Sequence, residues 1–434
     1  MTTELIITFG SLRQSKEFLA FLNNDIFKTA HILEDRGDGY AKPVDELLLE
    51  TLELIKTRNL PVKAFVSLGR ATVIDGIPNI IECWQKIKQT FIPQLEKTQY
   101  IGPSYIAGKC IPDKWLATEL FNLLELPVSK AKHLDLNNNA QSIFSFPFIL
   151  KPTRFSGGGG MKYVENDSSF SIAKEKLKRL GENQAIITEF IQGMEVSVEI
   201  LRLDGRVLVF PIGTKQFTDT SLSHAENKVR VYGYLKPIPN FVQDAIKIVE
   251  ALDIKGLFSV EGIVHDKHSM NWKIIEAATR VSGNLPMEQA STNISAFRNI
   301  AKYLQGKELD MKLKSINVAV EISIYNHNNE QTVQAFLQLP WVKRSLLSDL
   351  SELKGSEVQK KRVSVGFMAG EGKDLRERCL ILEKISGDNA IFNRIKSAIQ
   401  ELNDFFGDYV INPQLYDLNN YNSSSCDKER TLAG

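Results

Sequence analysis

The stretch Phe148-Ile149-Leu150-Lys151-Pro152, followed by Ser156-Gly157-Gly158-Gly159-Gly160 and Met161-Lys162-Tyr163-Val164, decides how this chain folds. Two apolar runs joined by a glycine-rich loop are typical of a β-hairpin. Glycine permits positive φ and lets backbone N–H groups come close to phosphate oxygens. The loop does not end in Gly-Lys-Ser/Thr and does not lead into a helix, so it is not a P-loop. We predict a flap with Lys151 beside it, and a disordered linker is the alternative interpretation.

Two further runs follow the flap and are predicted to pair. Residues 185–191 form an apolar strand, and residues 195–200 alternate and are predicted to return from it across a turn at residues 192–194. Alternation places Glu195, Ser197 and Glu199 on one face of the returning strand. We expect Glu195 to contact a ligand and Glu199 to lie on an exposed polar face.

An acidic pair is predicted on two later apolar strands, residues 257–264 and 272–277. If they form a hairpin centred between His268 and Ser269, Glu261 and Glu276 lie directly opposite each other. Two ionised carboxylates in an apolar sheet are costly unless a positive charge lies between them. Hard oxygen ligands suit Mg²⁺, so a metal site is predicted. The alternatives are an ion pair with Lys255 or Lys273, or one protonated carboxyl group.

The order of these segments resembles the nucleotide site of the ATP-grasp ligases. It consists of the strand that ends at Lys151, the glycine flap, the strand before the turn at residues 192–194, and the two acidic strands. The motifs resemble those of carbamoyl-phosphate synthetase and biotin carboxylase, and the branch they resemble is that of the L-amino acid ligases, or dipeptide synthetases. The resemblance implies an ATP-grasp fold that binds ATP with Mg²⁺ or Mn²⁺.

The resemblance also implies which residues bind the nucleotide. These are Lys114, Lys151, Ser156, Gly157, Gly158, Gly159, Gly160, Glu189, Ile191 and Glu195. In the family, the lysines reach the phosphates. Backbone groups at Glu189 and Ile191 would meet adenine, and the carboxylate of Glu195 would accept hydrogen bonds from the ribose hydroxyls. Thr188 stands where family members usually carry a glutamate.

Catalytic and metal-binding roles are implied in the same way. Arg280 lies at the family's position for an arginine that binds the γ-phosphate, a bidentate task that suits a guanidinium group. Lys215 is expected to contact the terminal phosphates. Ala278 replaces a metal-binding asparagine, which points to the amino acid ligase branch. Asn284 is the candidate to supply an amide oxygen to the metal instead, beside Glu261 and Glu276.

Candidate substrate residues come from two loops. Related amino acid ligases place a glutamate and a histidine in the loop after Lys215, and here this loop contains His224 and Glu226. Solvated loop residues are the alternative interpretation for both. Ser282 and Gly283 are the other candidates, because the stretch that begins at Val281 leads into a helix where substrate selection is expected.

The N-terminal region alternates strand and helix patterns. Residues 5–9 and 62–69 are short apolar strands, and residues 47–55 form an amphipathic helix. This order predicts a parallel sheet with helices on both faces. Gly10 and Gly69 are expected to end strands, since no Gly-x-Gly-x-x-Gly fingerprint is present.

The predicted fold class is α/β and α+β, an ATP-grasp fold in three domains and a tail. These are a doubly wound, Rossmann-like domain at 1–108, a nucleotide-binding region at 109–310 with its flap-bearing part at about 130–190, a C-terminal α+β lobe at 311–418, and a disordered tail at 419–434. In the C-terminal lobe the patterns predict strands at 317–325 and 361–369, and helices at 332–339, 374–384 and 390–406.

Bulk composition excludes several classes of protein. The chain has 434 residues, 53 basic and 52 acidic, so no nucleic-acid or membrane-surface partner is indicated. Its four cysteines, at 83, 110, 379 and 426, form no Cys-x-x-Cys pair, which favours free thiols over zinc or disulfides. No apolar run approaches the roughly 20 residues of a membrane span, and no secretory leader is recognised. We expect a cytoplasmic enzyme.

The implied reaction is ATP-dependent joining of a carboxylate to an amine through an acyl phosphate. Phosphoryl transfer needs positioning and charge compensation and no nucleophilic side chain. The expected partners are two small molecules, most simply amino acids, and a homodimer is compatible with the resemblance. The alternatives are a biotin carboxylase-like enzyme and a nucleotide-binding regulatory protein without turnover.

Overall fold

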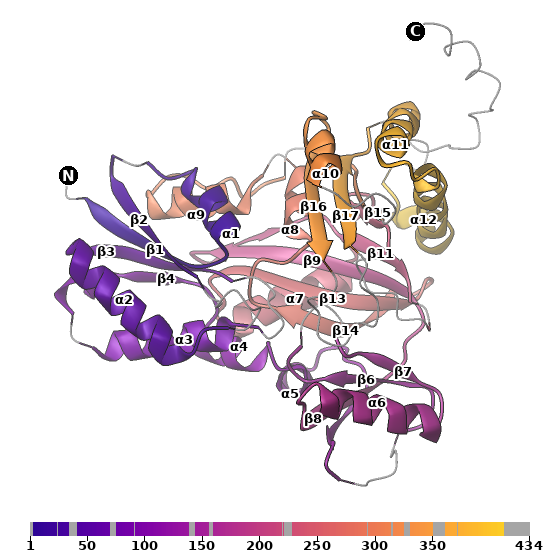
Figure 1. Ribbon diagram of the computed structural model, residues 1–434, viewed down its shortest axis with the longest axis horizontal. Coiled ribbons are helices and arrows are strands. Elements are labelled where there is room, and N and C mark those ends of the chain that lie inside the picture. The colour runs from indigo at the N-terminus through magenta and orange to yellow at the C-terminus, as the bar shows by residue number, and fades with distance from the viewer. Residues whose placement is uncertain are drawn as a thin grey trace, which may run out of the picture.

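Three β-sheets form the framework of the molecule in this computed structural model (Figure 1). The described residues are 3–23, 25–33, 41–69, 75–90, 92–138, 144–155, 159–218, 220, 228–292, 294–313, 316–324, 330–349, 361–370 and 372–411. The predicted tail at 419–434 lies outside them. The mixed sheets and helices confirm the predicted fold class.

The N-terminal sheet is parallel and has helices on both faces. Its strands are ordered β2 (Phe27–Leu33), β1 (Glu4–Gly10), β3 (Val62–Leu68) and β4 (Gln99–Ile101), and its helices are α1 (Leu12–Leu19), α2 (Val44–Arg58) and α3 (Ile77–Gln89). Leu5, Ile7 and Phe9 of β1 share a buried cluster with α2 and α3, whereas Ile6 packs on the other side with Phe18 of α1. The doubly wound arrangement follows from this alternation. Neither β2 nor α3 was predicted from the sequence.

The second sheet carries the flap and is antiparallel. Its strands are ordered β5 (Ala131–Asp135), β8 (Gln184–Glu189), β6 (Phe148–Pro152) and β7 (Lys162–Val164), with α6 (Asp167–Arg179) packed on one face. The predicted β6–β7 hairpin is confirmed. Gly160 has φ +74°, a conformation that favours glycine. Residues 156–158 of the flap are outside the described chain.

The third sheet has nine strands and forms the centre of the molecule. Along it lie β14 (Asn271–Ala278), β13 (Gly256–Asp266), β9 (Met194–Leu203), β11 (Gly213–Phe217), β12 (Arg230–Tyr232), β15 (Ala319–Ile324), β17 (Lys361–Met368) and β16 (Val342–Asp349), while β10 (Arg206–Val209) pairs with β9. The predicted strands of the C-terminal lobe therefore extend the same sheet that holds the acidic pair. Strand β16, which completes that edge, was not predicted from the sequence.

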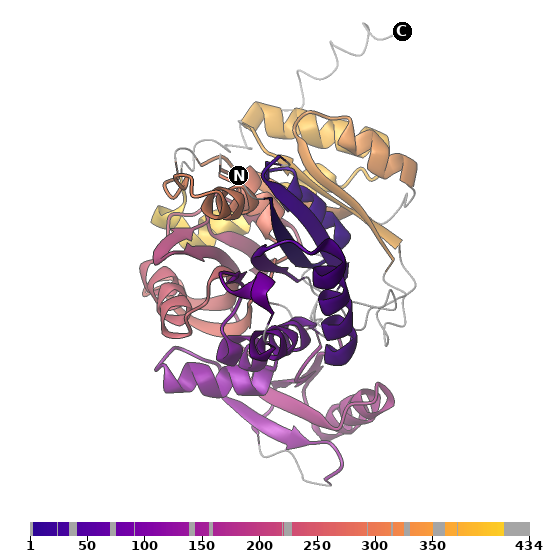
Figure 2. The ribbon, with the colours of Figure 1, turned by 90° about the vertical axis from the view of Figure 1, so that its left-hand side faces the viewer.

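Helices cover the nine-stranded sheet and join it to its neighbours. They are α4 (Tyr105–Cys110), α5 (Lys114–Leu123), α7 (Pro239–Ala251), α8 (Leu285–Ala290), α9 (Ala296–Leu304), α10 (Glu330–Leu337), α11 (Gly372–Ser386) and α12 (Ile391–Phe406), with short 3-10 turns at Pro93–Leu95 and Gly407–Tyr409. A side view shows the orange and yellow C-terminal helices at the opposite end of the molecule from the magenta flap-bearing sheet (Figure 2). No helix within the described ranges is long and apolar enough to span a membrane.

The cysteine prediction can be checked at three positions. Cys83, Cys110 and Cys379 are free thiols, and Cys83 and Cys379 are buried. Cys426 falls outside the described ranges.

The prediction that residues 195–200 return along residues 185–191 is wrong. β8 lies in the flap-bearing sheet, and β9 lies in the nine-stranded sheet between β13 and β11. The chain crosses at Gly193, where an added Cβ would lie 2.2 Å from the carbonyl oxygen of Val264. Gly193 also exchanges hydrogen bonds with Thr218, one through each residue's backbone N–H. This close approach to β13 carries the chain out of one sheet and into the other.

Gly193→Ala is expected to lower the free energy of unfolding by about 2 kcal/mol, because the new methyl group would overlap backbone that cannot move away alone. Urea denaturation followed by circular dichroism measures the change. Gly283→Ala is the matched control, since a Cβ there meets nothing within 4 Å. Equal stability of the two variants would contradict the assigned role of Gly193.

Candidate active site

A cavity of about 320 Å³ lies between the flap-bearing sheet and the nine-stranded sheet. It brings together most of the site residues predicted from sequence. Those that line it are Lys114, Lys151, Gly159, Glu189, Ile191, Glu195, Lys215, Glu261, Glu276, Arg280, Ser282, Gly283 and Asn284. Gly160 is not among its lining residues. Ser156, Gly157, Gly158, His224 and Glu226 lie outside the described residues.

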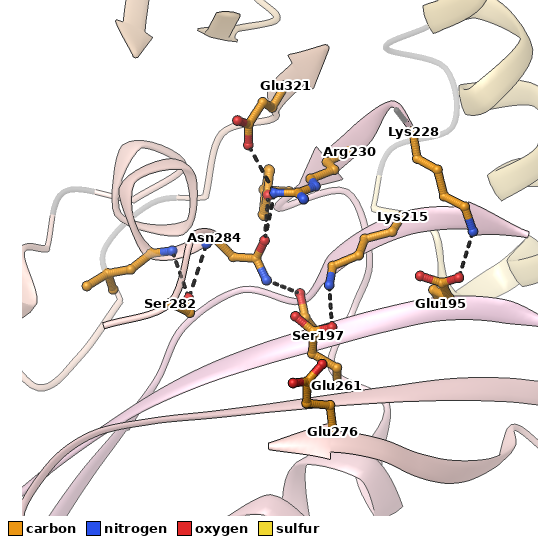
Figure 3. Close-up of polar contacts among 12 residues, drawn as sticks. Glu195, Ser197, Lys215, Lys228, Arg230, Glu261, Glu276, Ser282, Asn284 and Glu321 are labelled. Atoms are coloured by element: carbon orange, nitrogen blue, oxygen red, sulfur yellow. Dashed lines mark hydrogen bonds and ion pairs between the residues drawn. The ribbon is translucent and has the colours of Figure 1, made fainter. Parts of the chain in front are cut away.

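The acidic pair lies where the strand pattern predicted it. Glu261 on β13 is the register partner of Glu276 on β14. Lys215 Nζ lies 2.5 Å from a Glu261 carboxylate oxygen, and Lys114 Nζ lies 3.7 Å from one of Glu276 (Figure 3 shows the pair with Lys215). Burial alone would raise the pKa of Glu261, but Lys215, with help from Arg230, lowers it. The charge compensation that the pair requires comes from these lysines.

The two ion pairs considered from sequence do not form. Lys255 donates a hydrogen bond to the Tyr303 hydroxyl at 2.7 Å, and Lys273 pairs with Glu189 at the end of β8. Within the described chain, no group of three or more His, Cys, Asp or Glu side chains could hold a metal. Two carboxylates facing one cavity nevertheless form a hard-oxygen donor set that fits a divalent cation whose other ligands come from a bound molecule.

Lys151 projects from β6 into the same cavity. Its ammonium group is 3.5 Å from the Ile275 carbonyl, and the described residues give it no carboxylate partner. Burial, followed by the charge of Lys114, lowers the pKa of Lys151 to about 8, while Glu276 partly opposes the shift. An anion beside this group would stabilise its protonated form.

Two glutamates predicted to contact a nucleotide lie along one side of the cavity, and both are paired. Glu195 on β9 accepts a hydrogen bond from Lys228 at 2.6 Å. Glu189 accepts one from the backbone N–H of Lys130 at 2.9 Å, in addition to its contact with Lys273. These pairs hold the last residue of β8 and the start of β9 across the crossing between the sheets.

Arg280 is anchored by an acid that the sequence analysis did not identify. Its Nε donates to Asp75, just before α3, at 2.8 Å, and both side chains are largely buried. Next to it, Ser282 Oγ accepts hydrogen bonds from the backbone N–H groups of Asn284 and Leu285 and so holds the start of α8. The turn after β14 is thereby fixed to the N-terminal sheet at one end and to α8 at the other.

Asn284, the candidate third metal ligand, is held by three side chains. Its side-chain oxygen accepts hydrogen bonds from Tyr232 at 3.1 Å and Arg230 at 3.3 Å, and its amide nitrogen donates to Ser197 at 3.2 Å (Figure 3). Binding a metal would break the contacts of that oxygen. In this structure Asn284 links β9 to β12.

The expectation that Glu199 is exposed is wrong. Glu199 is fully buried, because its face of β9 runs from the cavity at Ser197 to the core at Leu201, which packs against the N-terminal unit. Glu288 of α8 is fully buried as well, and neither carboxyl group has a hydrogen-bond partner among the described residues. Burial raises the pKa of Glu199 to about 8, and burial next to Glu199 raises that of Glu288 well above its usual range.

Further charged residues at the site were not assigned from sequence. Arg230 and Arg344 both contact Glu321, at 3.5 and 3.4 Å, and Lys228 holds Glu195. Alternation on β12, which places Arg230 and Tyr232 on one face, was the only local signal. Asp75 and Glu321 reach the site from distant parts of the chain, so no local spacing indicates them.

Comparison with known proteins defines the class. Residues 111–284 match the family model of the ATP-grasp domain. The large chain of carbamoyl phosphate synthase from Methanobrevibacter smithii is 26% identical over 250 residues, which are 55% of this chain and 23% of that protein. This chain thus spans about a quarter of that relative.

Two solved structures share the fold across nearly the whole chain. One is the biotin carboxylase domain of 2-oxoglutarate carboxylase from Hydrogenobacter thermophilus, which was solved with MgADP, ADP and bicarbonate. Its TM-score is 0.62 at 13% sequence identity, and the match covers 94% of this chain and 99% of that domain. The other is L-amino acid ligase from Bacillus licheniformis, with a TM-score of 0.63 at 12% sequence identity. The match covers 89% of this chain and 98% of the ligase. The architecture is therefore an ATP-grasp fold. More particularly, residues 111–284 are the part of this chain that matches the ATP-grasp domain.

Glu199→Gln is expected to become more stable relative to the wild type as pH rises. The pKa of Glu199 is about 8 in the folded protein against an ordinary value of 4.5, so the folded state holds the proton longer than the unfolded state. As the pH rises from 4.5 to about 8, the free energy of unfolding of the wild type should therefore decrease by up to about 1.4 kcal/mol per pH unit. The glutamine side chain of the variant does not titrate, so the variant should not show this decrease. Urea unfolding at pH 5, 6, 7 and 8 measures it.

The surface substitution Glu250→Gln on α7 is the control and should follow the wild type at every pH. Parallel curves for Glu199→Gln and the wild type would show that Glu199 is solvated in the folded protein.

Proposed function

We propose that this protein is an ATP-dependent ligase that joins a carboxylate to an amine, most simply two amino acids. One observation carries the proposal: Glu261 and Glu276 oppose each other in a cavity between two sheets, balanced by Lys215 and Lys114. Acids that are compensated only by lysine side chains can exchange those partners for a cation and a polyphosphate.

The nucleotide would lie along the cavity with its phosphates toward the lysines. Lys151, which the described residues leave without a carboxylate partner, and Lys114 are the groups proposed to bind phosphate oxygens. Backbone groups of Glu189 and Ile191 are proposed to contact adenine. The carboxylate of Glu195 would release Lys228 and accept hydrogen bonds from the ribose hydroxyls instead. The flap at 156–160 would cover the phosphates, as the family resemblance implies.

Glu261 and Glu276 are the residues that fit a magnesium ion, and manganese would suit the same oxygens. When bound, the ion would neutralise charge on the phosphates. MgADP in the structure of the Hydrogenobacter thermophilus domain supports this assignment. In this proposal Asn284 keeps its contacts with Arg230 and Tyr232 and does not bind the metal.

Arg280 and Lys215 are proposed to offset the charge that develops during phosphoryl transfer. A carboxylate oxygen of the first substrate attacks the γ-phosphorus, and the bond from that phosphorus to the departing ADP oxygen breaks. The amine nitrogen of the second substrate then attacks the acyl carbon, loses a proton and expels inorganic phosphate. Because the chain contributes position and charge, no nucleophilic side chain is required.

Two features favour an amine over bicarbonate chemistry. Ala278 lines the cavity where the family pattern has a metal-binding asparagine, and it points to the amino acid ligase branch. The likeness to the Bacillus licheniformis L-amino acid ligase is compatible with this choice. Phosphate release from MgATP would be measured with a pool of the twenty amino acids, with bicarbonate, or with neither. Release that needs the amino acids supports the ligase, whereas release that needs bicarbonate, or tight ATP binding without release, rejects it.

Glu276→Gln is expected to reduce phosphate release at least about 100-fold while the protein stays folded, because one of the two proposed metal ligands loses its charge. Release is followed with a coupled phosphate assay and folding with circular dichroism. Glu250→Gln on the outer face of α7 serves as the control and should keep full activity. Normal turnover in Glu276→Gln would remove the metal assignment.

Nucleotide affinity is expected to fall as pH rises through about 8, the pKa of Lys151. Only the protonated ammonium attracts phosphate, so affinity at pH 9 should be about tenfold lower than at pH 7. Titration calorimetry with MgADP measures this change. Lys151→Met should bind weakly at both pH values and lose the dependence, whereas Lys267→Met, in the exposed β13–β14 turn, should retain it. Identical pH profiles for the wild type and Lys151→Met would contradict the assignment.

A further inference from the structure

A second cavity, of about 250 Å³, adjoins the first. The two share Arg280, Ser282 and Gly283 in their walls. The other walls come from α1, α8 and α9 and from Arg344 on β16, so this cavity lies between the N-terminal unit and the far edge of the nine-stranded sheet. At Gly283 an added Cβ would meet nothing within 4 Å, which leaves open space at the junction.

Arg344 belongs to a charged group with an excess of positive charge. Arg344 and Arg230 share the carboxylate of Glu321, and their side chains are 15% and 13% exposed, against 6% for Glu321. The nearby acid Glu261 is already neutralised by Lys215. Two guanidinium groups thus meet at one carboxylate in a poorly solvated place, which favours an anion beside Arg344.

The carboxyl groups next to this cluster do not remove that excess. The pKa values of Glu199 and Glu288 are raised by burial, to about 8 for Glu199 and well above the usual range for Glu288. Burial therefore disfavours a negative charge on either group.

The hydrogen bonds of Arg344 point to where that anion would bind. One terminal nitrogen donates to the Gly283 carbonyl at the junction of the cavities. The Nε–H group is buried and has no acceptor among the described residues. A guanidinium edge that includes Nε matches the two oxygens of a carboxylate. Polar groups of Gln14 on α1 and Gln289 on α8 complete a wall suited to a small polar ligand.

We propose that the second cavity holds the amine-bearing substrate, and that Arg344 binds its carboxylate. The substrate class is thus a small amino-carboxylate such as an α-amino acid. Its amine would pass Gly283 toward Arg280, beside the acyl phosphate formed in the first cavity. This inference rests on the proposed ligase function and adds to it the identity of the nucleophile and a residue that selects it.

The test supplies MgATP with the pool of twenty amino acids, which provides the carboxylate to be phosphorylated, together with the same pool as α-carboxamides. Both pools can then serve as the amine, and mass spectrometry compares the dipeptides formed with the dipeptide amides. Arg344→Met should raise the KM for the amino acids about tenfold to a hundredfold and abolish their preference over the carboxamides. MgADP binding should be unchanged. Glu321 keeps Arg230 and the Ser364 hydroxyl as partners, so the variant should fold. Lys343→Met removes an exposed positive charge one residue away and should behave as the wild type.

The inference is supported if Arg344→Met loses the preference for amino acids over carboxamides and Arg344→Lys keeps part of it. A purely structural defect would affect amino acids and carboxamides equally. A preference that survives in Arg344→Met, or wild-type protein that uses both pools equally, overturns it. If the wild type releases no phosphate with any amine, the ligase proposal fails. The inference about Arg344 is then tested separately, by calorimetric binding of the amino acid pool in the presence of MgADP. Binding lost in Arg344→Met supports it, and absence of binding in the wild type rejects it.

Discussion

Opposed carboxylates in a sheet are the constraint on which the site depends. Glu261 and Glu276 face each other on adjacent strands, where apolar neighbours make an uncompensated pair of charges costly. Lys215 arrives from β11 in the same sheet, while Lys114 arrives from the start of α5. The charge balance therefore requires three parts of the chain to meet at one place. The same charge balance suits a cation with phosphates.

The crossing between β8 and β9 gives the cavity its two walls. A hairpin would have kept both strands in one sheet, but Gly193 lets the chain pass against Val264 and enter the second sheet. Glu189 and Glu195 lie on either side of the crossing, each held by a lysine. Side chains from the flap-bearing sheet and from the nine-stranded sheet consequently face the same space.

The face of β9 that begins in the cavity continues into the core beneath the N-terminal unit. Ser197 contacts Asn284, Glu199 is buried without a partner, and Leu201 packs in the cluster that contains Phe18 of α1. The cluster of Arg230, Glu321 and Arg344 lies beyond Asn284, toward the C-terminal strands. One buried polar network thus connects the proposed nucleotide cavity to a second cavity that reaches α1.

By itself, the sequence determined the features that depend on local periodicity and turn chemistry. The β6–β7 hairpin, the register of Glu261 with Glu276 and the doubly wound N-terminal sheet all follow from alternation and from glycine-rich loops over short stretches. Only the tertiary structure decided which strands share a sheet, which side chains are buried and which distant charges meet. Glu199 was predicted to be exposed on an alternating strand, but the N-terminal unit packs over its face at Leu201 and buries it. The contacts of Asn284 with Arg230 and Tyr232 likewise come from a strand distant in sequence. Asp75 with Arg280, and Arg344 with Glu321, are contacts across more than twenty residues of chain, which no local pattern encodes.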